Sequence, residues 1–119
     1  CFQRLTVHLR LVDYDLVYDK EHLAKIMKIV NDYEGPKYLI TDDYRLANEL
    51  FPGLCSVLKF EDFNSIDSWT FIANSSHVVT SDSSYSLSAA FIGAKKTIYH
   101  PKFTNIIVDE FLNHIWKKL

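Results

Sequence analysis

Short apolar segments alternate with helix-like segments along almost the whole chain of 119 residues, and this alternation limits the possible folds more than any other feature. Apolar runs of strand length that are bounded by polar residues, Gly or Pro predict β-strands. Such strands are predicted at residues 5–9, 38–41, 56–60, 77–80 and 97–99. Apolar residues that recur at helical spacing predict helices at residues 20–33, 65–73, 85–92 and 107–119, and one more between Asp43 and Pro52.

A strand followed by a helix, repeated along the chain, is typical of a parallel sheet. Each return to the next strand is then a right-handed crossover, and the helices cover both faces of the sheet. The hydrophobic fraction of 48% supplies a core for one domain of this length. The sequence therefore predicts a single α/β domain over residues 1–119, with a Rossmann-like parallel sheet of about five strands and helices on both faces.

Charge and composition argue against several classes of protein. The formal net charge of -2 is not that of a general nucleic-acid binder. No apolar run approaches the roughly 20 residues that a membrane-spanning helix needs. The sequence shows no signal peptide and does not begin with Met, so we expect a piece of a longer enzyme. Cys1 and Cys55 form no disulfide framework and lack zinc-ligand spacing, so we expect no metal, and the low cysteine count is compatible with a cytoplasmic enzyme.

Ligands of parallel α/β sheets bind outside the carboxyl ends of the strands, so the residues that follow each strand are the first candidates for a site. The first strand leads into His8, Arg10 and Asp13. Strand alternation places His8 and Arg10 on the same side of the chain. The planar guanidinium of Arg10 suits a phosphate group, although a local ion pair with Asp13 is the alternative.

The second predicted strand runs into Thr41-Asp42-Asp43 and then into a helix. A carboxylate at this point commonly caps the helix. Because there are two carboxylates, one remains to accept hydrogen bonds from a guanine edge or a ribose hydroxyl. We expect Asp42 to serve mainly as the cap, so that the spare carboxylate is that of Asp43.

The fourth predicted strand is followed by Ser81-Asp82-Ser83-Ser84 and another helix. Hydroxyl donors and backbone N–H groups at the start of a helix can hold a phosphate, and an ordinary Ser/Asp helix cap is the alternative. The chain has neither a Gly-x-Gly-x-x-Gly motif nor a Gly-x-x-x-x-Gly-Lys motif, which argues against a dinucleotide-binding domain and a P-loop NTPase. The remaining histidines are assigned no ligand: His77 is expected to be structural, and His22, His100 and His114 to lie on the surface or in helices.

Taken together, these segments resemble the GDP-fucose-binding lobe of fucosyltransferases, most closely the α-1,2-fucosyltransferase family (glycosyltransferase family eleven). The family motif His-x-Arg-Arg-x-Asp-Tyr corresponds to His8-Leu9-Arg10-Leu11-Val12-Asp13-Tyr14. The family's Ser/Thr-Asp-Asp motif corresponds to Thr41-Asp42-Asp43. A third region of the family resembles Ile72-Ala73-Asn74-Ser75-Ser76 and the downstream Ser83-Ser84-Tyr85-Ser86. The similarity runs over about residues 6–103.

The resemblance implies a role for each matched residue. Arg10 would contact the β-phosphate and stabilise the departing GDP, and His8 would lie against the guanine or the ribose. Asp43, or Asp42, would accept hydrogen bonds from guanine. The phosphate oxygens would be held by Ser83 and Ser84.

The resemblance also implies a reaction, the inverting transfer of fucose or a related sugar to a glycan hydroxyl, with no metal and no cofactor beyond the nucleotide-sugar donor. The general base would come from a missing amino-terminal lobe of the same enzyme or from the loop that carries Asp13, so Arg10 and Asp13 are the candidate catalytic residues. The isolated chain, as the carboxyl-terminal lobe of a two-lobed enzyme, is expected to be inactive.

Three alternatives stay open. The chain can be a lobe of a glycosyltransferase with a different donor. It can be a degenerate, non-catalytic nucleotide-sugar-binding domain, because Leu11 stands where the family motif has its second Arg. A receiver-like signalling domain also alternates strands and helices, but Tyr99-His100-Pro101 lacks the Lys that such a domain carries after its fifth strand.

Overall fold

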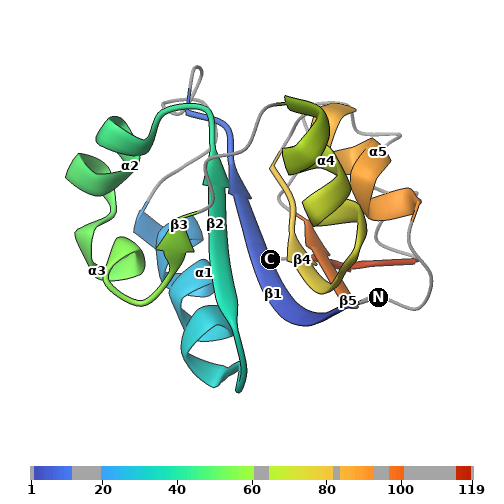
Figure 1. Cartoon of the computed structure of the whole chain (residues 1–119). Coiled ribbons are helices and arrows are strands. Elements are labelled where there is room, and N and C mark those ends of the chain that lie inside the picture. The colour runs from blue at the N-terminus through green and yellow to red at the C-terminus, as the bar shows by residue number, and fades with distance from the viewer. Residues whose placement is uncertain are drawn as a thin grey trace.

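The computed structural model describes residues 2–11, 20–60, 65–81, 84–92, 97–100 and 115–118. Its strands all run parallel in one sheet, in the order β3-β2-β1-β4-β5-β6 (Figure 1). The four longer strands are β1 (Phe2–Leu9), β2 (Lys37–Thr41), β4 (Ser75–Val79) and β5 (Thr97–His100). The two-residue strands β3 (Lys59–Phe60) and β6 (Lys117–Lys118) extend the sheet at its two edges. The prediction of an α/β fold with a parallel sheet is therefore confirmed.

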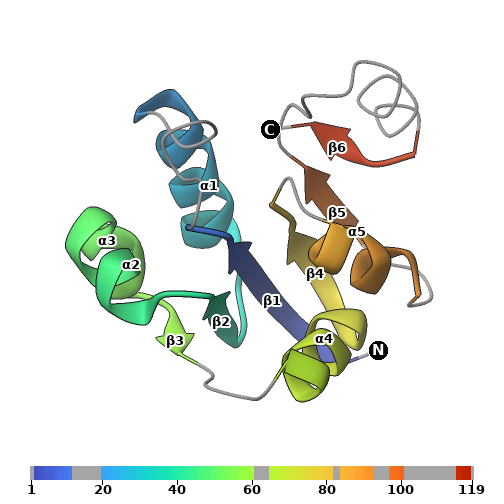
Figure 2. The same ribbon diagram turned by 90° about the horizontal axis from the view of Figure 1, so that it is seen from above.

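Helices cover the two faces of this sheet (Figure 2). The helices α1 (Lys20–Asp32), α2 (Tyr44–Leu50) and α3 (Pro52–Cys55) lie on one face, and α4 (Ser65–Ala73) and α5 (Ser84–Phe91) lie on the other. Adjacent residues of a strand point to opposite faces, so Val79 joins the hydrophobic cluster under α1 while Val78 joins the cluster under α4 and α5.

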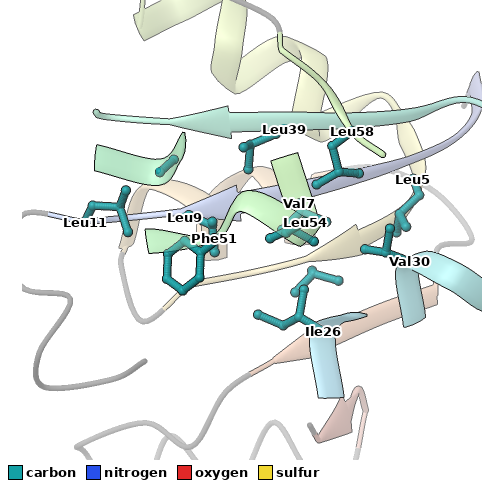
Figure 3. Packing of buried hydrophobic residues seen from close by; sticks show 12 residues of the cluster. Leu5, Val7, Leu9, Leu11, Ile26, Val30, Leu39, Phe51, Leu54 and Leu58 are labelled. Carbon is teal, nitrogen blue, oxygen red and sulfur yellow. The ribbon is translucent and has the colours of Figure 1, made fainter. Parts of the chain in front are cut away.

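The larger cluster packs β1 against the first three helices (Figure 3). Leu5, Val7 and Leu9 alternate along β1 and are fully buried. Ile26 and Val30, one turn apart on α1, meet them from above the sheet. The same periodicity in the sequence that predicted α1 thus buries one face of that helix. No helix in the described ranges is both long and apolar enough to cross a membrane.

Gly35 marks the turn from α1 into β2. Its φ of +136° lies in the region that side-chain-bearing residues rarely adopt. A Cβ atom at this position would also lie 3.1 Å from Cε2 of Tyr33. Glycine is therefore required here by both the backbone conformation and the space.

Two predicted elements were wrong in part. The third strand was predicted over residues 56–60, but only Lys59 and Phe60 pair with β2. Residues 56–58 form the turn that follows α3, a helix with Pro52 in its first turn, where the missing N–H costs nothing. The Cys55 thiol donates to the Ala47 carbonyl at 3.3 Å, so that this cysteine ties α3 to α2.

The end of the chain also differs from its prediction. Residues 107–119 were predicted to be helical, but Lys117 and Lys118 pair in parallel with Tyr99 and His100. Trp116 packs on the Phe91 ring, with centroids 4.8 Å apart. The pairing of Lys117 and Lys118 with β5 joins segments that are not adjacent in sequence, and local periodicity cannot reveal it. Residues 107–114 lie outside the described residues.

Candidate functional site

The direction in which successive strands are added to the sheet reverses between β1 and β4, and we call this place the switch point. From β1 the chain moves outward through β2 to β3, and from β4 it moves outward through β5 to β6 on the other side. Such a point leaves a crevice at the carboxyl ends of the two central strands, where parallel α/β proteins bind ligands. Val7 of β1 pairs with Val79 of β4, so the residues that follow them reach the same edge of the sheet.

His8 and Ser81 form a hydrogen-bonded pair across this switch point. Ser81 Oγ lies 2.7 Å from Nδ1 of His8. His8 is 6% exposed and Ser81 only 1%. The Tyr85 ring of α5 lies beside the imidazole, with centroids 5.3 Å apart. The pair is thus a buried polar contact at the edge where the first and fourth predicted strands end.

Burial and two neighbouring charges set the ionisation of His8. The pKa of His8 is lowered from 6.5 to about 4, mainly by burial, which the attraction of Asp42 opposes and the positive charge of Arg10 reinforces. The imidazole is therefore neutral at pH 7. The charges of Arg10 and Asp42 therefore act on one ring with opposite sign.

The two adjacent carboxylates after β2, those of Asp42 and Asp43, have different hydrogen-bond partners. Asp43 is the N-cap of α2, and its Oδ1 accepts a hydrogen bond from the Leu46 amide at 2.9 Å. Asp42 Oδ1 instead accepts from the Leu11 amide at 2.7 Å, which joins the loop after β2 to the chain after β1. The prediction that Asp42 serves as the cap was wrong: Asp43 immediately precedes the first helical residue, and only from there does a side chain reach the amide of N3.

The structure brings some of the predicted site residues together and leaves others undescribed. His8, Arg10, Asp42 and Asp43 all lie at the carboxyl edge, where Arg10, Asp42 and Asp43 are exposed. Asp13 and Ser83 lie outside the described residues. Ser84 begins α5, directly beyond the end of β4, and only its backbone is described.

Sequence reasoning missed the contact of Ser81 with His8 and the position of His100. Ser81 belongs to the Ser-rich segment that was singled out, but the hydroxyls chosen from it were those of Ser83 and Ser84. The contact with His8 joins residues 73 positions apart and depends on β1 and β4 being neighbours. His100, expected on the surface or in a helix, is fully buried in β5. His77, expected to be structural, contacts Ser76 Oγ through Nδ1 at 2.9 Å.

A separate groove lies between α1 and the strands β1, β4 and β5. Its volume is about 300 Å³, and its walls include the rings of Tyr33, His77 and Tyr99. The Tyr33 and His77 ring centroids are 4.8 Å apart. The residues that line this groove include none of the predicted site residues and none of the residues around His8, so the groove is separate from the carboxyl-edge cluster.

Neither a metal centre nor a known relative guides the assignment. Within the part of the chain that the structure describes, no three His, Cys, Asp or Glu residues come together to hold a metal ion. A scan against protein-family models found no match, and searches of curated proteins and of solved structures found none. The function is therefore inferred from the chemistry of the carboxyl-edge residues.

Proposed function

We propose that this chain is a nucleotide-sugar-binding domain that holds the diphosphate of its donor at the carboxyl edge of the sheet, between β1 and β4. The observation that carries the proposal is the meeting of His8 and Ser81 at the switch point, where the charges of Arg10 and Asp42 also act on the imidazole. The strand order is that of Rossmann-like, doubly wound sheets, which bind nucleotides in this crevice.

Arg10 is the proposed phosphate ligand. It directly follows Leu9, the last residue of β1, and is exposed at the edge where a ligand would approach. A guanidinium offers several N–H donors in one plane and matches two oxygens of a phosphate at once. When a nucleoside diphosphate leaves as an anion, such a fixed positive group stabilises the charge that develops.

The carboxylates beside this cluster are proposed to select the base. Guanine presents adjacent N1–H and N2–H₂ donors, which one carboxylate can accept together. Each carboxylate accepts one backbone amide, Asp43 that of Leu46 and Asp42 that of Leu11. Because Asp42 also acts on the imidazole of His8, we favour Asp42 as the group that reads guanine. The donor is therefore proposed to be GDP-fucose or a related GDP-sugar.

The remaining parts of the proposal concern side chains and segments that the structure does not describe. Ser83 and Ser84 are proposed to hold phosphate oxygens at the start of α5. Asp13, or a residue of an amino-terminal lobe, is proposed as the general base for inverting, metal-independent transfer to a glycan hydroxyl. The chain would then be the carboxyl-terminal lobe of a two-lobed, fucosyltransferase-like glycosyltransferase, inactive by itself.

One observation favours a second candidate, a nucleotide-sugar-binding domain that has lost catalysis. Leu11 stands where the α-1,2-fucosyltransferase motif has its second Arg, and Leu11 is 1% exposed within the core under α1. A second guanidinium cannot be placed there without burying a charge in an apolar cluster. Binding of GDP-fucose without any transfer by a longer chain that includes the amino-terminal lobe would favour this candidate.

Isothermal titration calorimetry with GDP, ADP and UDP tests the proposal directly. We expect GDP to bind most tightly and Arg10→Ala to weaken it. Arg45→Ala is the matched control, because Arg45 is also exposed but pairs with Glu49 on α2, at 3.5 Å. Absence of GDP binding to the folded wild-type chain would rule the proposal out.

A further inference from the structure

We propose that Ser81 is a positioning residue: its hydroxyl donates to Nδ1 of His8, which places the imidazole proton on Nε2 and makes His8 a neutral hydrogen-bond donor for the bound nucleotide. The part of this inference that concerns the ligand rests on the proposed function. The part that concerns the tautomer is a property of the free protein and can be measured alone.

The geometry of the pair supports a hydroxyl donor. The distance of 2.7 Å from Ser81 Oγ to Nδ1 is short for an N–H donor and typical for an O–H donor. Both residues are almost fully buried, so water does not compete for either atom. A neutral imidazole has one bare nitrogen and one N–H group, and a hydroxyl that donates to Nδ1 leaves the proton on Nε2.

The surroundings of His8 explain the use of a neutral donor at this place. Ser81 after β4 and Tyr85 on α5 contact the imidazole, and the charges of Arg10 after β1 and Asp42 after β2 act on it. A charged imidazolium would repel the Arg10 guanidinium, whereas a neutral ring lets both groups approach one anionic ligand. Since Ser81 occupies Nδ1, Nε2 is the nitrogen that is left for the ligand.

The same sheet contains a matched pair that serves as a control. Ser76 Oγ lies 2.9 Å from Nδ1 of His77, so the atoms in contact are those of the first pair. Ser76 and His77 are sequence neighbours within β4, before the switch point, and His77 is only half-buried. Removal of the Ser76 hydroxyl should therefore leave nucleotide binding unchanged.

The test combines NMR of the histidine side chains with calorimetry. In a long-range ¹H–¹⁵N correlation at pH 7, we expect wild-type His8 to show a protonated Nε2 and a bare Nδ1. In Ser81→Ala the ¹⁵N chemical shifts of the two ring nitrogens should move towards the averaged values of a ring that exchanges between its two tautomers. Ser81→Thr, which keeps the hydroxyl, should keep the two chemical shifts apart, as in the wild type. GDP affinity should fall roughly 5- to 20-fold in Ser81→Ala and stay unchanged in Ser76→Ala.

Each failure has its own signature. A proton on Nδ1 in the wild-type chain overturns the inference whether or not GDP binds, and this measurement needs no variant to fold. Equal GDP affinities of wild type and Ser81→Ala, with a changed tautomer, overturn the donor role and leave the proposed function standing. No GDP binding by the wild type overturns the proposed function and the donor role together, while a proton on Nε2 would still support Ser81 as the group that sets the tautomer.

Discussion

At the amino end of β1, the Arg4 guanidinium donates to the Phe71 carbonyl at 2.8 Å and to Ser75 Oγ at 3.0 Å, and it lies 3.4 Å over the Phe71 ring. At the carboxyl end of the same strand, Arg10 is exposed beside a buried His8. Arg4 ties β1 to the carboxyl end of α4, where helix carbonyls need donors. The comparison separates an arginine that stabilises the fold from one that stands where a ligand would bind.

His8 and His77, in two neighbouring strands, differ in the same way. Burial lowers the pKa of His77, and the nearby Lys117 lowers it further, but His77 lies half-exposed beside Tyr33. Burial lowers the pKa of His8 to about 4, and Arg10 and Asp42 also act on it. Burial of a polar group costs free energy unless the group is hydrogen-bonded, and buried groups with a shifted pKa are typical of functional sites. The carboxyl end places such a group, His8, at the switch point.

Arg4→Ala should give the largest effect, a loss of about 3 kcal/mol in the free energy of unfolding, because it removes two charge-assisted hydrogen bonds, to the Phe71 carbonyl and to Ser75 Oγ, and the stacking on Phe71. Urea denaturation measures this loss. Arg45→Ala, at an exposed position, should change stability by less than about 0.5 kcal/mol. If the folded Arg4→Ala variant bound GDP more weakly than wild type, the division between the two ends of β1 would be wrong.

The sequence predicted those features that depend on local pattern. The alternation of apolar strands and amphipathic segments was sufficient for the parallel sheet, and it placed His8 and Arg10 at the end of β1. The pairing of Lys117 and Lys118 with β5 was not predictable in this way, because it joins distant segments. The contact of Ser81 with His8 was missed for the same reason: it requires the strand order, which no single motif contains.

Lowering the pH should destabilise the protein through His8. Because the pKa of His8 falls from 6.5 to about 4 on folding, the unfolded chain binds more protons between these two values, so stability is highest above pH 6.5 and falls as the pH drops towards 4. The shift corresponds to as much as about 3 kcal/mol. Urea midpoints measured from pH 7 to pH 4 check it.

Histidine substitutions locate this pH dependence. His8→Gln should flatten the fall in stability between pH 6.5 and 4, because it removes the titrating group. His77→Gln should flatten it less, because its ring is more exposed. An unchanged slope in His8→Gln would show that another group at the carboxyl end, rather than His8, carries the titration.

Arg10→Ala should weaken GDP binding by about 2–3 kcal/mol, which is the scale of a lost charge-assisted contact. The free energy of unfolding should stay nearly constant, in contrast to Arg4→Ala. Arg10→Lys should recover only part of the affinity, since a point charge does not reproduce the planar donors. Calorimetry and urea denaturation of the same samples separate the two effects. Unchanged GDP affinity in Arg10→Ala would make Arg10 structural, like Arg4.

The smallest effects should come from the neighbouring residues Asp42 and Asp43. Here too, one residue is expected to stabilise the fold and the other to contact the ligand. Asp43→Ala removes the cap of α2 and should lower stability by about 1 kcal/mol, with no change in base preference. Asp42→Asn keeps the shape of the side chain but replaces one acceptor oxygen by a donor. It should therefore reduce the preference for GDP over ADP and UDP by about 1–2 kcal/mol. If Asp43→Ala reduced that preference and Asp42→Asn did not, the capping residue would also be the base reader, as first predicted from the sequence.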